Sequence, residues 1–246
     1  MLIALLSDIH ANREALSACL AHARQSGAER FIFLGDYVGY GADPEWVVDR
    51  VIEHVGRGAI ALQGNHDAAI DAPSVRMNPV AAASIDWTRP RLDRARRDFL
   101  AALALQREES GRLFVHANAW APANWGYVLG AEDARRSLAA TPCQQTFCGH
   151  VHVPCLYHTG VLDKIGTLTP TAGVEIPLLP RRQWLSVLGA VGQPRDGNPA
   201  AAYALLDDLR NTLIHVRVAY DVDSAARKIV SAGLPGVLAE RLYRGQ

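Results

Sequence analysis

Residues 1–10 read MLIALLSDIH, an apolar run that ends in an aspartate and a histidine one residue apart. The segment from Leu2 to Leu6 is short and uniformly apolar, which is typical of a buried strand. The stretch lacks the basic residues that open a signal peptide, so we expect it to belong to the folded protein. Asp8 and His10 therefore follow directly on a predicted strand.

The segments after this strand alternate between predicted helices and predicted strands. Asn12 and the pair Asp43-Pro44 are each suited to begin a helix. This order of strand, helix, strand, helix, strand predicts parallel βαβ units. Further strands are expected at 31–34, 59–62, 113–115 and 146–148, a short helix at 131–140, and helical structure over 66–105 with breaks near Pro79 and Pro90.

From about residue 154 the sequence pattern changes. Short apolar runs separated by Gly, Pro or Asn favour a second sheet that is mostly antiparallel. We find no internal repeat and no linker, so we expect residues 1–246 to form a single domain. The runs lie near 154–158, 161–165, 184–191, 202–206 and 212–218, and two amphipathic helices are predicted at 223–232 and 235–243.

The composition limits the class of protein. Hydrophobic residues make up 49% of the 246 residues and the formal net charge is +0, so a large core is available and a strongly basic face for nucleic acid is not indicated. No apolar run approaches the ~20 residues that span a bilayer, so no membrane contact is expected. The four cysteines form no CxxC pair, which favours idle thiols in a reducing cytoplasm over a structural zinc site.

Five polar motifs each follow a predicted strand: SDIH, GDYVG, GNHD, FVHAN and CGHVH. Because the carboxyl ends of parallel strands meet at one edge of a sheet, we expect these side chains to gather there. In each DxH or HxH pair, an extended backbone would point both side chains the same way. Oxygen and imidazole ligands suit Mn, Fe, Ni or Zn. The candidate ligands are Asp8, His10, Asp36, Asn65, His116, His150 and His152.

Each motif alone has an ordinary explanation. A Gly-Asp or Gly-Asn pair is usually a turn, an HxH pair is more often solvated than bound to metal, and a histidine after a strand is more often a hydrogen-bonded core residue. Because all five occur in order, each after a strand, independent coincidence is implausible, and a common metal site is the better interpretation.

The series D-x-H, G-D-x-x-G, G-N-H-D, H, G-H-x-H resembles the calcineurin-like metallophosphoesterases. The C-terminal stretches VGQPRDGNPAAAYALLD (191–207) and GLPGVLAERLYRG (233–245) are similar to a bacterial subgroup often described as diadenosine-tetraphosphatase-like. The resemblance implies a four-layer α/β/β/α sandwich with two central mixed sheets. Two positions depart from the family pattern: Ala117 stands where relatives often have glycine, and Ala190 where they often have serine.

The resemblance also implies a mechanism. One divalent ion would bind Asp8, His10, Asp36 and His152, and the other Asp36, Asn65, His116 and His150. A hydroxide shared by the two ions would attack phosphorus in line with the leaving oxygen. His66, as an imidazolium, would protonate the leaving group or stabilise the transition state; a purely structural contact is its alternative. Asp67 after it would orient His66 or cap a helix.

Arg195, in GQPRDGNP, is a candidate phosphate-binding residue, with a turn-stabilising surface arginine as the equal alternative. Trp120, Trp125, Tyr37 and Tyr40 lie near the motifs and could stack on a nucleobase, although ordinary packing is the better interpretation for any one of them.

We therefore expect a cytoplasmic, metal-dependent phosphoesterase that hydrolyses phosphomonoesters or phosphodiesters of small, nucleotide-related molecules. A catalytically weak binding scaffold of the same fold is disfavoured because the metal-site histidines are retained. A DNA nuclease is disfavoured by the neutral net charge.

Overall fold

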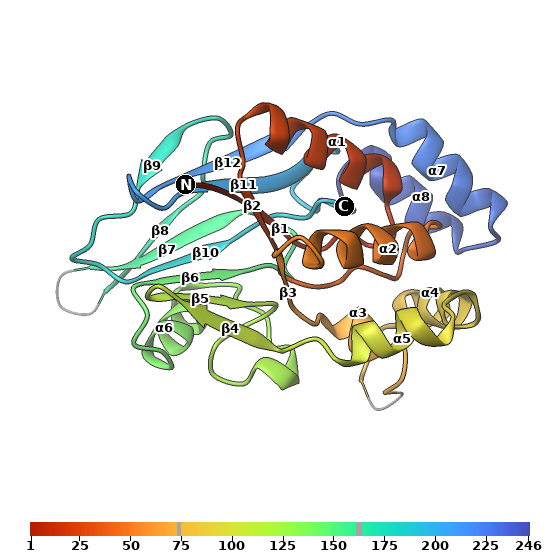
Figure 1. The fold of residues 1–246 in the computed structure, drawn as a ribbon, viewed down its shortest axis with the longest axis horizontal. Coiled ribbons are helices and arrows are strands. Elements are labelled where there is room, and N and C mark those ends of the chain that lie inside the picture. The colour runs from red at the N-terminus through yellow and green to blue at the C-terminus, as the bar shows by residue number, and fades with distance from the viewer. Residues whose placement is uncertain (73–74, 161–163) are drawn as a thin grey trace.

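Two six-stranded sheets form the centre of the molecule (Figure 1). The structure is a computed structural model that describes residues 1–72, 75–160 and 164–246. The strands are β1 (Leu2–Leu6), β2 (Arg30–Phe33), β3 (Ile60–Ala61), β4 (Gln106–Glu109), β5 (Arg112–Val115), β6 (Gln145–Cys148), β7 (Cys155–Thr159), β8 (Ile165–Leu168), β9 (Glu175–Pro177), β10 (Trp184–Val187), β11 (Ala201–Asp207) and β12 (Thr212–Val218). The first sheet has the order β3-β2-β1-β11-β12-β9 and the second β4-β5-β6-β10-β7-β8.

Helices cover the outer face of each sheet. The helices are α1 (Arg13–Gln25), α2 (Pro44–Val55), α3 (Asn65–Ala68), α4 (Pro79–Thr88), α5 (Arg94–Ala101), α6 (Ala131–Ala139), α7 (Val222–Ser231) and α8 (Gly236–Arg244), with short 3₁₀ turns at Arg89–Arg91 and Pro122–Asn124. Helix α1 packs on β11 and β12 of the first sheet, and α6 packs on β7, β8 and β10 of the second. The expected four-layer α/β/β/α sandwich with two mixed sheets is confirmed.

Strand β1 shows why the sheets stack. Leu5 packs into the apolar layer between the two sheets with Leu34 and Phe147, whereas its neighbour Leu6 packs with Leu16 under the helices. Because successive side chains of a strand point to opposite faces, a uniformly apolar strand must be covered on both. The apolar run at the N-terminus therefore places β1 in the middle of the sandwich.

From the sequence we expected the C-terminal strands to form the second sheet. This expectation is wrong, because these strands are divided between the two sheets. Strands β11, β12 and β9 extend the first sheet, with β11 antiparallel to β1, and β10, β7 and β8 extend the second, with β10 parallel to β6. Without these partners β1 and β6 would each have an unpaired edge beside the core. The C-terminal half thus completes both sheets.

The predicted helical region 66–105 is interrupted more than the sequence indicated. Helix α3 ends at Ala68, and α4 begins only at Pro79, where the Asn78 side chain accepts a hydrogen bond from the Ala81 amide. An Asn-Pro pair is a helix start, so it marks a second helix here and not a break within one. Of the strand expected at 161–165, residues 161–163 lie outside the described residues, and β8 begins at Ile165. Among the described residues, no helix is long and apolar enough to cross a membrane.

Candidate metal centre

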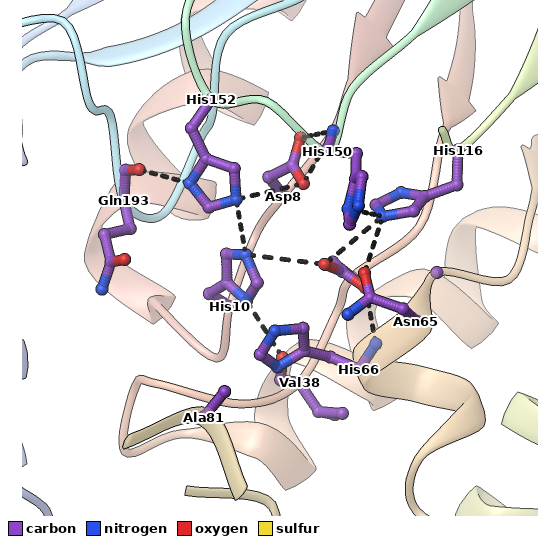
Figure 2. A network of polar contacts seen from close by, with 12 residues as sticks. Asp8, His10, Val38, Asn65, His66, Ala81, His116, His150, His152 and Gln193 are labelled. Atoms are coloured by element: carbon purple, nitrogen blue, oxygen red, sulfur yellow. Dashed lines mark hydrogen bonds and ion pairs between the residues drawn. The ribbon is translucent and has the colours of Figure 1, made fainter. Parts of the chain in front are cut away.

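The five motifs meet at the carboxyl ends of strands from both sheets. Strands β1, β2 and β3 are parallel neighbours and lead to Asp8, Asp36 and Asn65, while the parallel strands β5 and β6 of the other sheet lead to His116 and His150. From the sequence we expected a single sheet edge. The site instead collects strand ends of both sheets, and Figure 2 shows the side chains that they bring together.

One group of ligand atoms surrounds the ring of His10. Its Nε2 lies 3.1 Å from Nε2 of His152 and 3.7 Å from Oδ2 of Asp36. Oδ1 of Asp8 lies 3.3 Å from the same nitrogen of His152. These four side chains are the set that the resemblance assigned to one ion. The ligand atoms of Asp8, His10 and His152 lie close enough together to surround an ion, and Asp36 approaches this group through His10.

A second group surrounds the ring of His116. Its Nε2 lies 3.2 Å from Nδ1 of His150, 3.2 Å from Oδ1 of Asn65 and 3.4 Å from Oδ2 of Asp36. The same carboxylate oxygen of Asp36 therefore faces both groups. Because a carboxylate oxygen can bridge two cations, this arrangement fits a pair of ions that share Asp36.

Each of these four rings has an inner nitrogen, which lies in a ligand group, and an outer nitrogen on the other side of the ring. The outer nitrogen of each ring faces a backbone carbonyl oxygen. Because a carbonyl only accepts, the outer nitrogen carries the proton, and the inner one presents a lone pair to the site. Two lone pairs at 3.1 or 3.2 Å repel each other unless a proton or a metal cation lies between them. The contacts are His10 to Val38 (3.2 Å), His152 to Gln193 (2.6 Å), His116 to Leu34 (2.8 Å) and His150 to Trp125 (2.8 Å).

The site also carries buried negative charge. Asp8 and Asp36 are 0% and 1% exposed. Burial alone would raise the pKa of each carboxyl, but positive charge at His152 beside Asp8 and at His116 beside Asp36 holds both pKa values below the usual range. The carboxylates therefore require a proton or a cation at the inner nitrogens of these rings. Two buried carboxylates among inward-facing imidazoles form a donor set that fits divalent cations.

The backbone at the candidate ligands is not extended. Asp8, His10, Asp36, His150 and His152 all have φ between 50° and 67°, in the left-handed region that non-glycine residues seldom occupy. The DxH and HxH pairs are therefore not extended, and the prediction that an extended backbone points both side chains the same way is wrong. The left-handed turns bring the side chains together, at a conformational cost of about 1–2 kcal/mol per residue.

Hydrogen bonds between the first two motif loops hold these turns. The amides of Ile9 and His10 both donate to the carbonyl of Asp36, at 2.8 and 2.9 Å, and the Ala11 amide donates to Tyr37 at 2.8 Å. Backbone strain of this kind concentrates at functional sites, where surrounding contacts fix it.

The sequence and the fold are both similar to those of known proteins. Residues 1–210 match the calcineurin-like phosphoesterase superfamily domain. The chain belongs to this superfamily. It is 34% identical to an uncharacterized protein of Methanocaldococcus jannaschii over all of this chain and 98% of that protein.

Two solved structures share the fold of this superfamily member over its whole length. A metallophosphoesterase from Sphaerobacter thermophilus has a TM-score of 0.90 at 32% identity, covering 100% of this chain and 99% of that one. A hypothetical protein from Pyrococcus horikoshii has a TM-score of 0.78 at 18% identity, covering 100% and 98%. The second likeness concerns the fold alone.

His66, the predicted non-ligand histidine, lies at the edge of the centre. Its ring is 4.8 Å from that of His10 and 4.6 Å from that of Tyr40, and among the described residues its buried Nδ1 has no hydrogen-bond partner. Burial lowers the pKa of His66 to about 4, which favours the neutral ring. Asp36 already lies close to His66 and raises this pKa, so the predicted imidazolium form requires a further anion beside the ring.

Arg195 lies on the same side of the centre. It lines a small pocket of about 70 Å³ together with Asp36, His66 and His152, and its guanidinium lies 5.7 Å from the Tyr40 ring centroid. Nη2 of Arg195 donates to the side-chain oxygen of Gln193 at 3.1 Å. The structure thus places Arg195 beside the candidate ligands.

Asp67 has a role that the sequence analysis missed. It makes no hydrogen bond to His66; its carboxylate accepts from the amides of Asp36 (2.8 Å), Tyr37 (2.9 Å) and Gly64 (2.9 Å). Asp67 therefore fixes the Asp36 loop against the start of α3. A carboxylate three residues after a glycine indicates a helix cap, but nothing in the sequence shows that it also binds a distant loop.

Proposed function

We propose that this protein is a phosphoesterase that holds two divalent metal ions and hydrolyses phosphomonoesters or phosphodiesters of nucleotide-like molecules. Two pairs of facing imidazole nitrogens, with one oxygen of Asp36 near a nitrogen of each pair, carry the proposal. Ions bound there would polarise phosphate oxygens and lower the pKa of water. Manganese, iron, nickel and zinc all suit these ligands.

Two further side chains have roles in this proposal. Arg195 binds phosphate oxygens, because its guanidinium lines the pocket beside the ligand groups. A phosphate beside His66 raises the pKa of the ring above the low value that burial gives it. His66 can then protonate the leaving oxygen or stabilise its developing charge.

The proposed substrate is a small molecule in the cytoplasm. The net charge of +0 gives no general attraction to nucleic acid. The four cysteines are free thiols, three of them buried, which suits a reducing compartment.

Metal analysis of the purified protein, with hydrolysis of p-nitrophenyl phosphate and its bis-ester in added manganese, tests the proposal. We expect bound metal and activity in the natural protein, and loss of both the second ion and activity in His116→Ala. The partly exposed His22 on α1 provides the matched control, His22→Ala, which should keep both.

Absence of metal from the natural protein, or activity that survives in His116→Ala, would refute the proposal. Metal binding without hydrolysis of any phosphate ester would favour the scaffold alternative. Salt-sensitive DNA binding with DNA cleavage would favour the nuclease.

A further inference from the structure

A large pocket opens directly beside the second ligand group. Its volume is about 430 Å³, and it is lined by Asn65, Arg76, Asn124, Trp125, Tyr127 and His150 among others. This volume is within the range of ~300–1,000 Å³ that is usual for small-molecule sites. Asn65 and His150 line both this pocket and the smaller pocket of Arg195, so the two pockets adjoin each other at the candidate metal centre. We call the larger one the ring pocket.

Two aromatic side chains of the ring pocket are tied to the metal ligands. Tyr127 stacks on the ring of His150, with centroids 4.1 Å apart and planes at 12°. Trp125 accepts the outer N–H of His150 through its carbonyl, and its ring lies edge-on to His116 with a centroid separation of 5.8 Å. The position of both aromatic residues is therefore fixed relative to the reacting centre.

Tyr127 is nevertheless 47% exposed, which is unusual for a ring that is held so firmly. Since His150 covers one face of the ring, its exposed area borders the pocket and solvent. The loop that carries it is also fixed: the side-chain Nδ2 of Asn118 donates to the Gly126 carbonyl at 2.8 Å, and the Leu129 backbone amide donates to the Asp133 carboxylate at 3.0 Å. An exposed aromatic ring on an ordered loop is a ready surface for stacking.

Arg76 lines both pockets and is exposed. Within the described part of the chain, no carboxylate forms an ion pair with it. A guanidinium at this position can stack on a planar ring or attract a second phosphate of the same molecule.

We infer that the ring pocket binds the planar ring of the substrate's ester group, with Tyr127 as the stacking surface and Trp125 and Arg76 beside it. The phosphate lies at the ligand groups near Arg195, and the nucleoside or aryl part extends toward Tyr127. This inference rests on the proposed function, and it identifies the residues that select esters with an aromatic ring over simple sugar or alkyl phosphates.

The test compares adenosine 5′-monophosphate with ribose 5-phosphate on the manganese-loaded protein. Both compounds carry phosphate on the same kind of primary hydroxyl and differ mainly in the base. We expect the natural protein to hydrolyse the nucleotide with the higher kcat/KM. Tyr127→Ala should reduce this preference roughly tenfold, because stacking on one aromatic ring gives that order of selectivity. Tyr127→Phe should retain it.

The control is Tyr243→Ala, which removes a comparably exposed tyrosine on α8 and should leave the preference unchanged. If Tyr127→Ala lowers kcat/KM equally for both compounds, Tyr127 only positions His150 and the inference is wrong.

Calorimetric binding of the same two compounds separates this inference from the proposed function. Tighter binding of the nucleotide that Tyr127→Ala removes supports the ring pocket even if neither compound is hydrolysed. Equal affinity for the two compounds overturns it, even if the protein is an active phosphoesterase.

Discussion

At the scale of single residues, Asp36 has the most demanding position in the centre. One of its oxygens faces His10 at 3.7 Å and His116 at 3.4 Å, while the other accepts the amide of His66 at 2.9 Å. Each remaining candidate ligand contacts the ligand atoms of one group. The centre therefore has one shared residue and two sets of dedicated ones.

Removing the shared residue should affect both ions. We expect Asp36→Ala to bind neither ion, whereas His152→Ala and His150→Ala should each retain one. Metal content by mass spectrometry measures this directly, and circular dichroism checks that each variant is folded. An Asp36→Ala protein that keeps one ion, or a His152→Ala protein that loses both, would contradict the proposed sharing.

Arg195 gives a second prediction at this scale. Arg195→Ala should raise KM for p-nitrophenyl phosphate by roughly tenfold or more, because a charge-assisted hydrogen bond contributes about 1.5–3 kcal/mol. Arg195→Lys should restore only part of this, since a lysine cannot bind two oxygens in a fixed plane. Steady-state kinetics with Arg227→Ala, an exposed arginine on α7, as the control would show whether any cationic surface residue has the same effect.

At the scale of elements, close approach of two loops positions the ligands. Gly64 precedes α3, and a Cβ atom built on it would overlap the amide nitrogen and Oδ1 of Asp36. The loop after β2 and the start of α3 can therefore touch only because this position has no side chain. Asp67 then joins the same two segments through three amide hydrogen bonds.

The substitution Gly64→Ala should push the Asp36 loop away from α3. We expect at least a tenfold loss of metal affinity, because ligand geometry must be kept within about 0.5 Å. Gly236→Ala at the start of α8, where a Cβ would meet no atom within 4 Å, is the matched control. Metal titration of both variants measures the difference, and equal affinities would show that the close approach is unimportant.

The elements also show how far the sequence could predict the site. The candidate ligands are recognisable because short apolar strands precede them, and the structure brings all seven together. The carbonyl oxygens of Val38, Leu34, Gln193 and Trp125 that orient the rings were not predictable, because a backbone acceptor leaves no mark on residue type. The left-handed φ values were also missed, since non-glycine residues seldom adopt them and tertiary contacts fix them here.

At the scale of the whole molecule, the two sheets must stay in register for their strand ends to meet. Apolar side chains pack between the sheets, with Leu5, Phe147, Leu206 and Leu213 in one layer. The strand order of the C-terminal half was not predictable, because short apolar runs fit either sheet equally well and only the free edges of β1 and β6 decide between them.

One buried polar contact also crosses between the sheets. His215 on β12 of the first sheet lies 3.3 Å from the hydroxyl of Ser186 on β10 of the second. It is 5% exposed, and burial lowers its pKa to about 4. In the unfolded chain a histidine has a pKa of about 6.5, so between these values the unfolded state binds more protons than the folded one.

This difference predicts a pH dependence of stability. The contribution of neutral His215 is complete above pH 6.5 and is lost as the pH falls toward 4, with a decrease of about 2 kcal/mol in the free energy of unfolding between pH 7 and pH 5. His215→Gln keeps a polar side chain but cannot titrate, so its free energy of unfolding should fall by about 2 kcal/mol less than that of the natural protein over this range. Urea unfolding of both proteins at the two pH values gives the comparison, in which other titrating groups cancel. Parallel pH dependence in the two proteins would mean that His215 gains a proton in the folded state as readily as in the unfolded one, and that the sheets separate enough at this point to admit water.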